Sequence, residues 1–461
     1  MEPVEVSREI LAPLEKVFAH FVSPSERERL TLHQEHVKEY RELDRGEKHL
    51  AYEFVFQSYG FRFWGKAREE FEPCAKTRIF VEAGPLKDAI IDLLFEPTEK
   101  GTLVRQITNV PEKAQGPLRR LFGTQLVSRV RALTAVHLDQ HGRDLEGLEP
   151  KTYTTAGEAR AAAAMDFLRL VRAVSAPMIL FPLLVGAALA AGEGTFSGWR
   201  LALTLAGGLL ALFAGNLTND IWDFEGGADH ATLGSEESQM TSSGALLSGG
   251  LSKRGAWILT AGLLGGATLF GAILTLDRPL VPFLALAGAA AAILYQAPLF
   301  RLSYVGRGLG EICVWLAFGP IPVTGAYYVQ TGIITKESFT LGAIAGLGAA
   351  LVLYCHHFLH WRSDREAGKM SPIAAMGPAT GAKVGILLSI LFAASLAATP
   401  WLFGIPGWAA LSGLIPLLLI PTFLRVANPE EKSTRRAWLL VQRAGAAFAA
   451  SLTLVSYSLW K

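Results

Sequence analysis

The alternation of apolar and polar residues changes sharply about a third of the way along the chain. Residues 1–150 contain short alternating runs punctuated by Gly, Pro, Asp or Lys, and no apolar run there is long enough to span a membrane. After Ala161 the chain becomes a series of apolar blocks of about twenty residues, the length that crosses a bilayer. The pattern predicts at least two domains, which we place at 1–145 and 165–461 with a linker at 146–164.

The first domain is predicted to be α+β, with an antiparallel sheet and two helices. A short strand at Val4–Glu9 precedes an amphipathic helix at Pro13–Val22, and Leu118–Leu138 closes the domain with apolar residues at helical spacing. Six further runs between the two helices alternate as strands do. These runs are Val37–Leu43, His49–Ser58, Phe61–Phe71, Thr77–Ala83, Ala89–Phe95 and Thr102–Thr108.

An aromatic strip follows two of these predicted strands. It has two interpretations: the rings line a cavity for an apolar ligand, or they form the core face of the sheet, because strands favour aromatic residues in any case. The strip consists of Tyr52, Phe54, Phe56, Tyr59, Phe61, Phe63 and Trp64.

The second domain is predicted to be an all-α bundle of nine membrane-spanning helices. Gly and Ala crowd these segments, which suits close helix packing in lipid. The segments are about 173–191, 201–218, 255–275, 280–296, 309–328, 339–359, 380–399, 405–424 and 437–459.

The distribution of basic residues over the loops predicts the orientation, because cytoplasmic loops are enriched in Lys and Arg. Eleven basic residues lie on one side, namely Lys253, Arg254, Arg301, Arg307, Arg362, Arg365, Lys369, Arg425, Lys432, Arg435 and Arg436. Four lie on the other side, namely Arg200, Arg278, Lys336 and Lys461. We therefore expect a multi-pass protein of the inner or cell membrane, with the N-terminal domain cytoplasmic and the C-terminus outside.

Composition narrows the function classes. The chain is 51% hydrophobic and 18% charged, with a net charge of +2, so it has no basic field that would suit nucleic acid. The three cysteines, Cys74, Cys313 and Cys355, have neither metal-site nor disulfide spacing. No basic segment followed by an apolar core opens the chain, so we expect no cleaved signal peptide.

A first polar cluster follows the second apolar segment. Asn216, Asp220 and Asp223 stand at i, i+4 and i+7 on one helical face, with Asn219 beside it and Asp229 shortly after. Carboxylates at membrane depth are costly, and oxygen ligands of this kind suit Mg²⁺ together with substrate phosphates. The alternative is a solvated loop with no chemical role.

A second polar cluster ends the sixth apolar segment. His356, His360 and Asp364 are spaced to share a helical face, and Arg365 and Lys369 follow them. The predicted topology puts both clusters on the cytoplasmic side. Together they predict a site for a diphosphate and Mg²⁺.

The two clusters resemble the motifs of the UbiA-type intramembrane prenyltransferases. The run from Asn219 through Asp220 and Asp223 to Asp229 is similar to the first Asp-rich motif of that family, and Asp364–Lys369 is similar to the end of its second motif. The segment from Tyr295 to Glu311 is most similar to the 1,4-dihydroxy-2-naphthoate branch, which makes menaquinone precursors. The resemblance covers residues 165 to 461.

The resemblance implies transfer of a polyprenyl group from its diphosphate to an aromatic acceptor at the membrane. Asp220, Asp223 and Asp364 are the implied catalytic residues. The implied Mg²⁺ ligands are Asn219, Asp220, Asp223, Asp229 and Asp364. The implied diphosphate-binding cations are Arg172, which is expected to be free to meet phosphate, Arg365 and Lys369.

The N-terminal domain resembles the START-like (SRPBCC) fold in the order of its elements: one strand, a helical segment, six strands and a last helix. In that family a curved sheet wraps the long helix around a cavity that holds a lipid or polyketide. The resemblance implies a domain that binds lipids or quinones and delivers the acceptor or receives the product.

One departure from the UbiA pattern leaves three interpretations open. The family usually has Asn-Asn-x-Arg-Asp before the final Asp-Arg, whereas this chain has histidine at 356, 357 and 360, and imidazole is a poor Mg²⁺ ligand. The chain is then an enzyme with a reduced magnesium shell, an enzyme with a changed metal or substrate, or a non-catalytic quinone or lipid carrier. The roles of Asn216, His356 and His360 stay open, as does a different acceptor such as a hydroxybenzoate, a tetrapyrrole or a glycerol phosphate.

Overall fold

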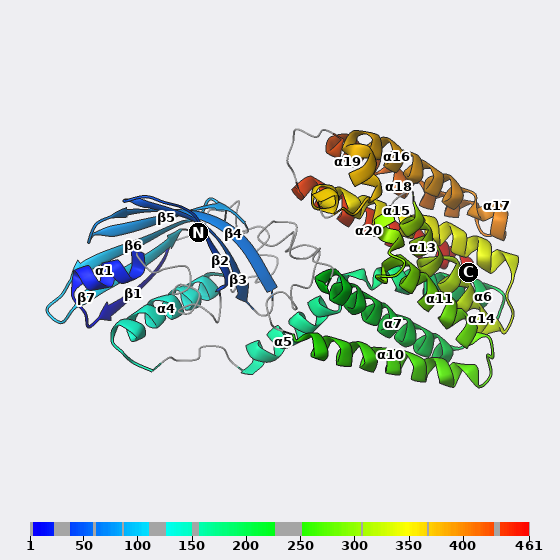
Figure 1. Ribbon diagram of the computed structural model, residues 1–461, viewed down its shortest axis with the longest axis horizontal. Coiled ribbons are helices and arrows are strands. Elements are labelled where there is room, and N and C mark those ends of the chain that lie inside the picture. Colours follow the sequence, from blue (N-terminus) through cyan, green and yellow to red (C-terminus); the bar gives the residue numbers. More distant parts are fainter. Residues whose placement is uncertain are drawn as a thin grey trace. The chain divides into compact units, whose positions relative to one another are not determined.

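A computed structural model shows how these elements are arranged (Figure 1). It describes residues 3–22, 37–58, 61–84, 87–109, 126–149, 156–225, 251–305, 308–366, 368–427 and 434–460. The chain divides into two units, Met1–Phe167 and Leu168–Lys461. Each unit has an apolar core of its own.

The first unit contains a seven-stranded antiparallel sheet in the order β1-β7-β6-β5-β4-β3-β2. Its described elements are β1 (Val4–Ile10), α1 (Leu14–Val22), β2 (Val37–Arg45), β3 (His49–Ser58), β4 (Phe61–Glu72), β5 (Lys76–Ala83), β6 (Ile90–Pro97), β7 (Thr102–Asn109), α4 (Leu126–Leu145) and α5 (Ala156–Leu170). Every neighbouring pair is antiparallel, and the first strand joins the last, so the predicted antiparallel sheet is confirmed.

The sheet and helices of this unit bury one apolar face. Ile10, Phe21, Phe95, Val104 and Leu138 share a core between the sheet, α1 and α4. Each of these large side chains contributes roughly 1.5–3 kcal/mol when it leaves water. The alternation that predicted the strands therefore reports which side chains face α1 and α4.

The ends of two predicted segments differ in the structure. The closing helix was expected at Leu118–Leu138, but α4 runs from Leu126 to Leu145, and residues 110–125 lie outside the described residues. Arg8 anchors the added turns by pairing with Asp139 and Glu146. Part of the expected linker is helical, because α5 begins at Ala156 within an alanine-rich run of high helix propensity.

The aromatic strip is described only in part. Tyr52 is buried in a cluster with Leu50 and Phe71, where Tyr40 stacks on it with ring centroids 5.0 Å apart. Phe54 packs against the same cluster. The side chains of the members from 56 to 63 lie outside the described residues, so the cavity stays a prediction, whereas Tyr52 belongs to the core.

The second unit is a bundle of apolar helices. Its elements are η2 (Ala173–Ser175), α6 (Pro177–Gly192), α7 (Gly198–Glu225), α10 (Lys253–Thr275), α11 (Val281–Gln296), α12 (Leu302–Val305), α13 (Leu309–Phe318), α14 (Pro320–Thr331), α15 (Lys336–Glu366), α16 (Pro372–Ala397), α17 (Thr399–Phe403), η3 (Gly407–Gly413), α18 (Leu414–Leu417), α19 (Ile420–Val426) and α20 (Thr434–Trp460). Several pairs and triples of these form single spans.

Eight segments of the described chain are long and apolar enough to cross a membrane. They are Ala173–Gly192, Gly198–Glu225, Lys253–Thr275, Leu309–Thr331, Lys336–Glu366, Pro372–Phe403, Gly407–Val426 and Arg436–Trp460. The ninth predicted span is the apolar helix α11, which has only 16 residues. At about 1.5 Å per residue it measures about 24 Å, short of the roughly 30 Å of a bilayer core. The count of nine spans is therefore not confirmed.

Helix α15 packs against α6, α13, α14, α16 and α20. Glycines allow its backbone to approach the α13–α14 span very closely. A Cβ at Gly346 would lie 2.5 Å from the Trp315 carbonyl oxygen, and one at Gly319 would lie 2.4 Å from the Gly346 Cα. Gly319 also breaks the span into α13 and α14, because its φ of −128° and ψ of −97° are not helical. The small residues thus serve helix packing, as lipid-embedded bundles require.

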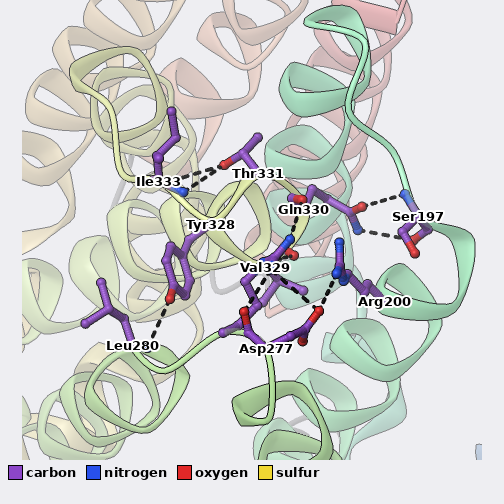
Figure 2. Close-up of polar contacts among 10 residues, drawn as sticks. Ser197, Arg200, Asp277, Leu280, Tyr328, Val329, Gln330, Thr331 and Ile333 are labelled. Atoms are coloured by element: carbon purple, nitrogen blue, oxygen red, sulfur yellow. Dashed lines mark hydrogen bonds and ion pairs between the residues drawn. The ribbon is translucent and has the colours of Figure 1, made fainter.

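A polar network closes the end of the bundle where α7 begins, opposite the end that carries the first polar cluster (Figure 2). Arg200 pairs with Asp277, and Nη2 of Arg278 donates to the Gln330 carbonyl oxygen at 3.0 Å. The Gln330 side chain in turn accepts from the Ser197 amide at 2.7 Å. These bonds satisfy main-chain groups at helix ends and join three loops. These contacts at this end of the bundle join loops and helix ends, whereas the two predicted polar clusters lie at the opposite end.

Candidate active site

Asp220 is held by an ion pair with Arg172. The Asp220 side chain is buried on α7, and its Oδ1 accepts from Nη2 of Arg172. Arg172 follows α5 and has a φ of 51°, a left-handed conformation that costs a non-glycine residue roughly 1–2 kcal/mol. Arg172 is therefore paired with a carboxylate through one guanidinium nitrogen, and its contact with phosphate stays a prediction. A buried carboxylate needs a cationic partner, and Arg172 supplies it.

Asn216 holds the turn that carries Arg172. Its Nδ2 donates to the Val171 carbonyl oxygen at 3.0 Å and to Ser175 Oγ at 2.9 Å. Asn216 and Asp220, one helical turn apart, thus both reach the segment between α5 and α6. The structure gives Asn216 a positioning contact through its amide nitrogen.

Asp223 lies one turn nearer the end of α7 and meets two donors. Asn219 Nδ2 donates to its Oδ2 at 2.7 Å, and the Tyr304 hydroxyl donates to its Oδ1 at 3.4 Å. Burial, reinforced by the Asp223 charge, raises the pKa of Tyr304 to about 12. The phenol therefore keeps its proton near neutral pH and remains a donor to the carboxylate.

Asp364 is buried near the end of α15 beside Lys369. Lys369 Nζ lies 3.5 Å from Asp364 Oδ1, while the buried Oδ2 receives no hydrogen bond from any residue that the structure describes. Gly368, at φ 73°, turns the chain back so that the Lys369 amide donates to the Asp364 carbonyl oxygen at 2.7 Å. This is a Schellman-type helix end, in which glycine avoids the Cβ penalty. Arg365 is exposed at this helix end.

Tyr304 joins the two clusters. Its hydroxyl contacts Asp223 from the first, and Lys369 Nζ from the second lies 5.4 Å from its ring centroid. The Met370 amide also donates to the Tyr304 carbonyl oxygen at 3.1 Å. Asp223, Asp364 and Arg172 are all within electrostatic range of the Tyr295 hydroxyl on α11. The predicted clusters therefore gather around two tyrosines at one end of the bundle.

Neither tyrosine was predicted to have a role, because both fall in a segment without charge periodicity. The available signal was the position of Tyr295 and Tyr304 inside the family-like segment that runs to Glu311.

The histidines of α15 divide into two groups. The rings of His356 and His360 lie with centroids 4.9 Å apart, and Arg172 and Lys369 are within electrostatic range of His356. His357 is buried and places Nε2 3.0 Å from Oε1 of Glu311 on α13. Sequence reasoning missed His357, although it precedes Asp364 by seven residues and so shares its helical face more closely than His356 does.

The carboxylates fit a magnesium ion that is bound together with a substrate. Among the described residues, no group of three His, Cys, Asp or Glu side chains is ready to hold a metal, and Asp229 lies outside them. Mg²⁺, however, is commonly held by one or two carboxylates while substrate phosphates and water complete its shell. The buried Asp364 Oδ2 with no described donor is the kind of oxygen that such an ion would satisfy.

The sequence model of the UbiA prenyltransferase family matches residues 179–452. The chain is 30% identical to the 2-carboxy-1,4-naphthoquinone phytyltransferase of Arabidopsis thaliana over 51% of this chain and 62% of that protein, less than two thirds of its length. It is 27% identical to the 1,4-dihydroxy-2-naphthoate octaprenyltransferase of Escherichia coli over 59% of this chain and 86% of that protein. A UbiA homologue from Archaeoglobus fulgidus, solved with GPP and Mg²⁺, aligns over 64% of this chain and 99% of that one, with 19% identity and a TM-score of 0.48.

Proposed function

Because the chain belongs to the UbiA prenyltransferase family, we propose that it moves a polyprenyl group from its diphosphate to an aromatic acceptor within the membrane. The contact that carries the proposal is the one at Tyr304, where Asp223 and Lys369 from two distant polar clusters meet. A carboxylate and an ammonium so placed, at the end of an apolar bundle, suit a substrate with a charged head and a long apolar tail.

The predicted metal ligands share one role in this proposal. Asn219, Asp220, Asp223, Asp229 and Asp364 would hold Mg²⁺ against the diphosphate. The bound ion would neutralise charge that develops on the departing diphosphate. The basic side chains of the chain would bind the diphosphate directly.

Lys369 is the cation best placed to stabilise the leaving diphosphate, because it lies 3.5 Å from Asp364 and above the Tyr304 ring. Arg172 keeps its carboxylate partner Asp220, and the fork of its guanidinium can share further N–H groups with a phosphate. Arg365 is exposed at the end of α15, so it can contact the substrate only if the diphosphate reaches past the buried Asp364 toward the surface.

The proposed acceptor is a naphthoquinol-type ring, as in the precursors of menaquinone-type quinones. The Arabidopsis and Escherichia coli relatives are both named for naphthalene-based acceptors. An electron-rich hydroxyaromatic ring attacks the allylic carbon when the bundle holds the two together. A hydroxybenzoate, a tetrapyrrole or a glycerol phosphate is the alternative acceptor.

For the N-terminal unit we propose a START-like domain that binds quinones or related lipids. Its strand order, with β1 beside β7 and α4 packed on both, supports the proposal. Removal of residues 1–145 from the full chain should weaken retention of a quinone on the purified protein. If the truncated and full-length proteins retain the same amount, the carrier role of this unit is wrong.

The direct test of the proposed function uses membranes that contain the full-length protein. Labelled polyprenyl diphosphates of several lengths are added with Mg²⁺ and a panel of hydroxyaromatic acceptors, and the lipid extract is analysed by mass spectrometry. A prenylated naphthalene product supports the proposal. Product with another acceptor corrects the acceptor alone, whereas no product with any pair leaves the carrier alternative.

A further inference from the structure

An acid–imidazole pair lies inside the bundle, away from the carboxylates assigned to the diphosphate. His357 on α15 places Nε2 3.0 Å from Oε1 of Glu311 on α13. Their side chains are only 6% and 16% exposed. Ionisable groups within a membrane span are costly, which makes a functional role the first hypothesis.

The pair faces the site. His357 and Asp364 are seven residues apart on α15, so they lie on nearly the same helical face and about 10 Å apart along the axis. Tyr295 supplies the second link, because Glu311, Asp223 and Asp364 are all within electrostatic range of its hydroxyl. Glu311 therefore borders the same polar region as the diphosphate carboxylates, but deeper along α15.

One carboxylate oxygen of Glu311, Oε2, has no described hydrogen-bond partner. Oε1 is taken by His357, and no other hydrogen bond to Glu311 is found among the described residues. The other titratable groups within electrostatic range of Glu311 include the Tyr295 and Tyr354 phenols and the Cys313 thiol. None of the three makes a described hydrogen bond to Glu311, so the histidine is the neighbour that orients the carboxylate here.

We propose that Glu311 is the catalytic base that takes the hydroxyl proton of the aromatic acceptor, with His357 as its positioning residue. The inference rests on the proposed prenyl transfer and deepens it. It places the acceptor ring between the diphosphate and Glu311, with its hydroxyl toward Oε2 of Glu311.

The proton and electron transfers balance. The C–O bond between the prenyl carbon and the diphosphate breaks, and its electron pair stays on the diphosphate. The ring carbon next to the hydroxyl forms the new C–C bond while the O–H proton passes to Oε2 of Glu311, which leaves a ring ketone. The alkylated carbon then loses its proton to the diphosphate, and Glu311 returns its proton to the oxygen, which restores the aromatic hydroxyl.

The experiment compares full-length variants in membranes with a series of substituted 1-naphthols of graded hydroxyl acidity. Glu311→Gln removes the basic oxygen but keeps the shape, and Glu311→Asp keeps a carboxylate on a shorter stem. Glu193→Gln is the matched control, because the Glu193 side chain also accepts a single described hydrogen bond, from the Tyr327 hydroxyl at 2.5 Å, at the far end of α6. Magnesium-dependent binding of the polyprenyl diphosphate is measured for every variant alongside transfer.

Glu311→Gln should lose transfer by a factor on the order of 10²–10⁴ with the least acidic naphthol, the usual contribution of a general base. The loss should shrink as the naphthol becomes more acidic, because an easily ionised hydroxyl needs less help. Diphosphate binding should be unchanged, Glu311→Asp should keep part of the rate, and Glu193→Gln should behave as wild type.

Two outcomes would overturn the inference: wild-type transfer by Glu311→Gln, or a loss of the same size with every naphthol. If Glu311→Gln also loses diphosphate binding, Glu311→Asp becomes the test variant. Its loss of transfer should then shrink as the naphthol becomes more acidic, and a loss of equal size with every naphthol would overturn the inference. If the wild type transfers no prenyl group to any acceptor, the proposed function itself is wrong, and so is the role of Glu311 as its base.

His357 has its own readout. His357→Gln keeps an N–H donor toward Glu311 and should retain most transfer, whereas His357→Leu should show the acidity-dependent loss of Glu311→Gln. Equal rates for the two variants would remove the positioning role.

Discussion

Lys369 Nζ lies 3.5 Å from Asp364 Oδ1 because the chain reverses at Gly368, whose φ is 73°. The reversal is fixed by main-chain bonds from Gly368 to the Arg365 carbonyl oxygen, at 3.2 Å, and from Lys369 to that of Asp364, at 2.7 Å. A cation five residues beyond a helical carboxylate is thereby folded back onto it. The order Asp-Arg-x-x-Gly-Lys thus has a geometric reason.

Gly368→Ala should weaken binding of a polyprenyl diphosphate. The left-handed conformation costs a residue with a Cβ roughly 1–2 kcal/mol, which is a loss of about five- to thirty-fold if Lys369 must be held in place by the turn. Gly262→Ala on α10 is the control, because a Cβ there has open space and no positive φ. Equal affinities of the two variants would show that the turn does not position Lys369.

Tyr304→Phe tests the link between the clusters. The variant removes the 3.4 Å bond to Asp223 but keeps the ring beneath Lys369, so we expect a loss of transfer of less than about ten-fold. Tyr304→Ala removes the ring as well and should lose more. Similar rates for both variants would assign the effect to the hydroxyl alone.

The pH dependence at Tyr304 follows from the sign of its shift. Burial raises its pKa from 10.0 to about 12. Between these two pH values the hydroxyl keeps its proton in the folded chain, whereas a tyrosine in the unfolded chain ionises. Any stability that depends on the neutral phenol is therefore complete below pH 10 and declines between pH 10 and 12. The pH–rate profiles of wild type and Tyr304→Phe should run parallel up to about pH 10, and divergence at lower pH would contradict the assignment.

The topology prediction depends on α11. With α11 crossing, the number of spans is odd and a reporter fused after Lys461 should lie outside, as the charge bias predicts. A reporter that behaves as cytoplasmic would mean that the 16-residue α11 does not cross the membrane. A second reporter at the N-terminus serves as the control and should be cytoplasmic in both cases.

His360→Asp restores the residue that the family pattern has at this position. If the histidine only weakens the magnesium shell, magnesium-dependent transfer should be unchanged or higher. Loss of transfer in His360→Asp would instead make the imidazole a working group, with a different metal or an acid–base role. His356→Ala is the companion variant, because the two rings lie 4.9 Å apart and share their surroundings.

The sequence pattern predicted what depends on local periodicity. Alternation located strands such as His49–Ser58 with their observed bounds. The spacing of Asn216, Asp220 and Asp223 predicted one shared helical face, and all three side chains meet other polar groups. Alternation reads the backbone period directly, so these predictions needed no knowledge of tertiary partners.

Partners across the fold could not be predicted in this way. The pairing of Arg172 with Asp220 depends on a left-handed residue after α5, and no periodicity signals that conformation. Glu311 meets His357 across the interface of α13 and α15, two helices whose close approach glycines allow. An apolar run in the sequence also does not fix the length of the helix that it forms. For this reason α11, which has only 16 residues, was predicted to be a full span.

The most direct test of the proposed prenyl transfer is Asp223→Asn, assayed as magnesium-dependent transfer from a polyprenyl diphosphate to a naphthol acceptor. The variant keeps the shape of the side chain but removes its charge, so transfer should fall by a factor on the order of 10²–10³, comparable with losing one electrostatic contact to a transition state. Asp277→Asn, at the opposite end of the bundle, should transfer at the wild-type rate. If the wild type and Asp223→Asn both show no transfer with any polyprenyl diphosphate, yet bind quinones equally well, the protein is a carrier and the proposed prenyl transfer is wrong.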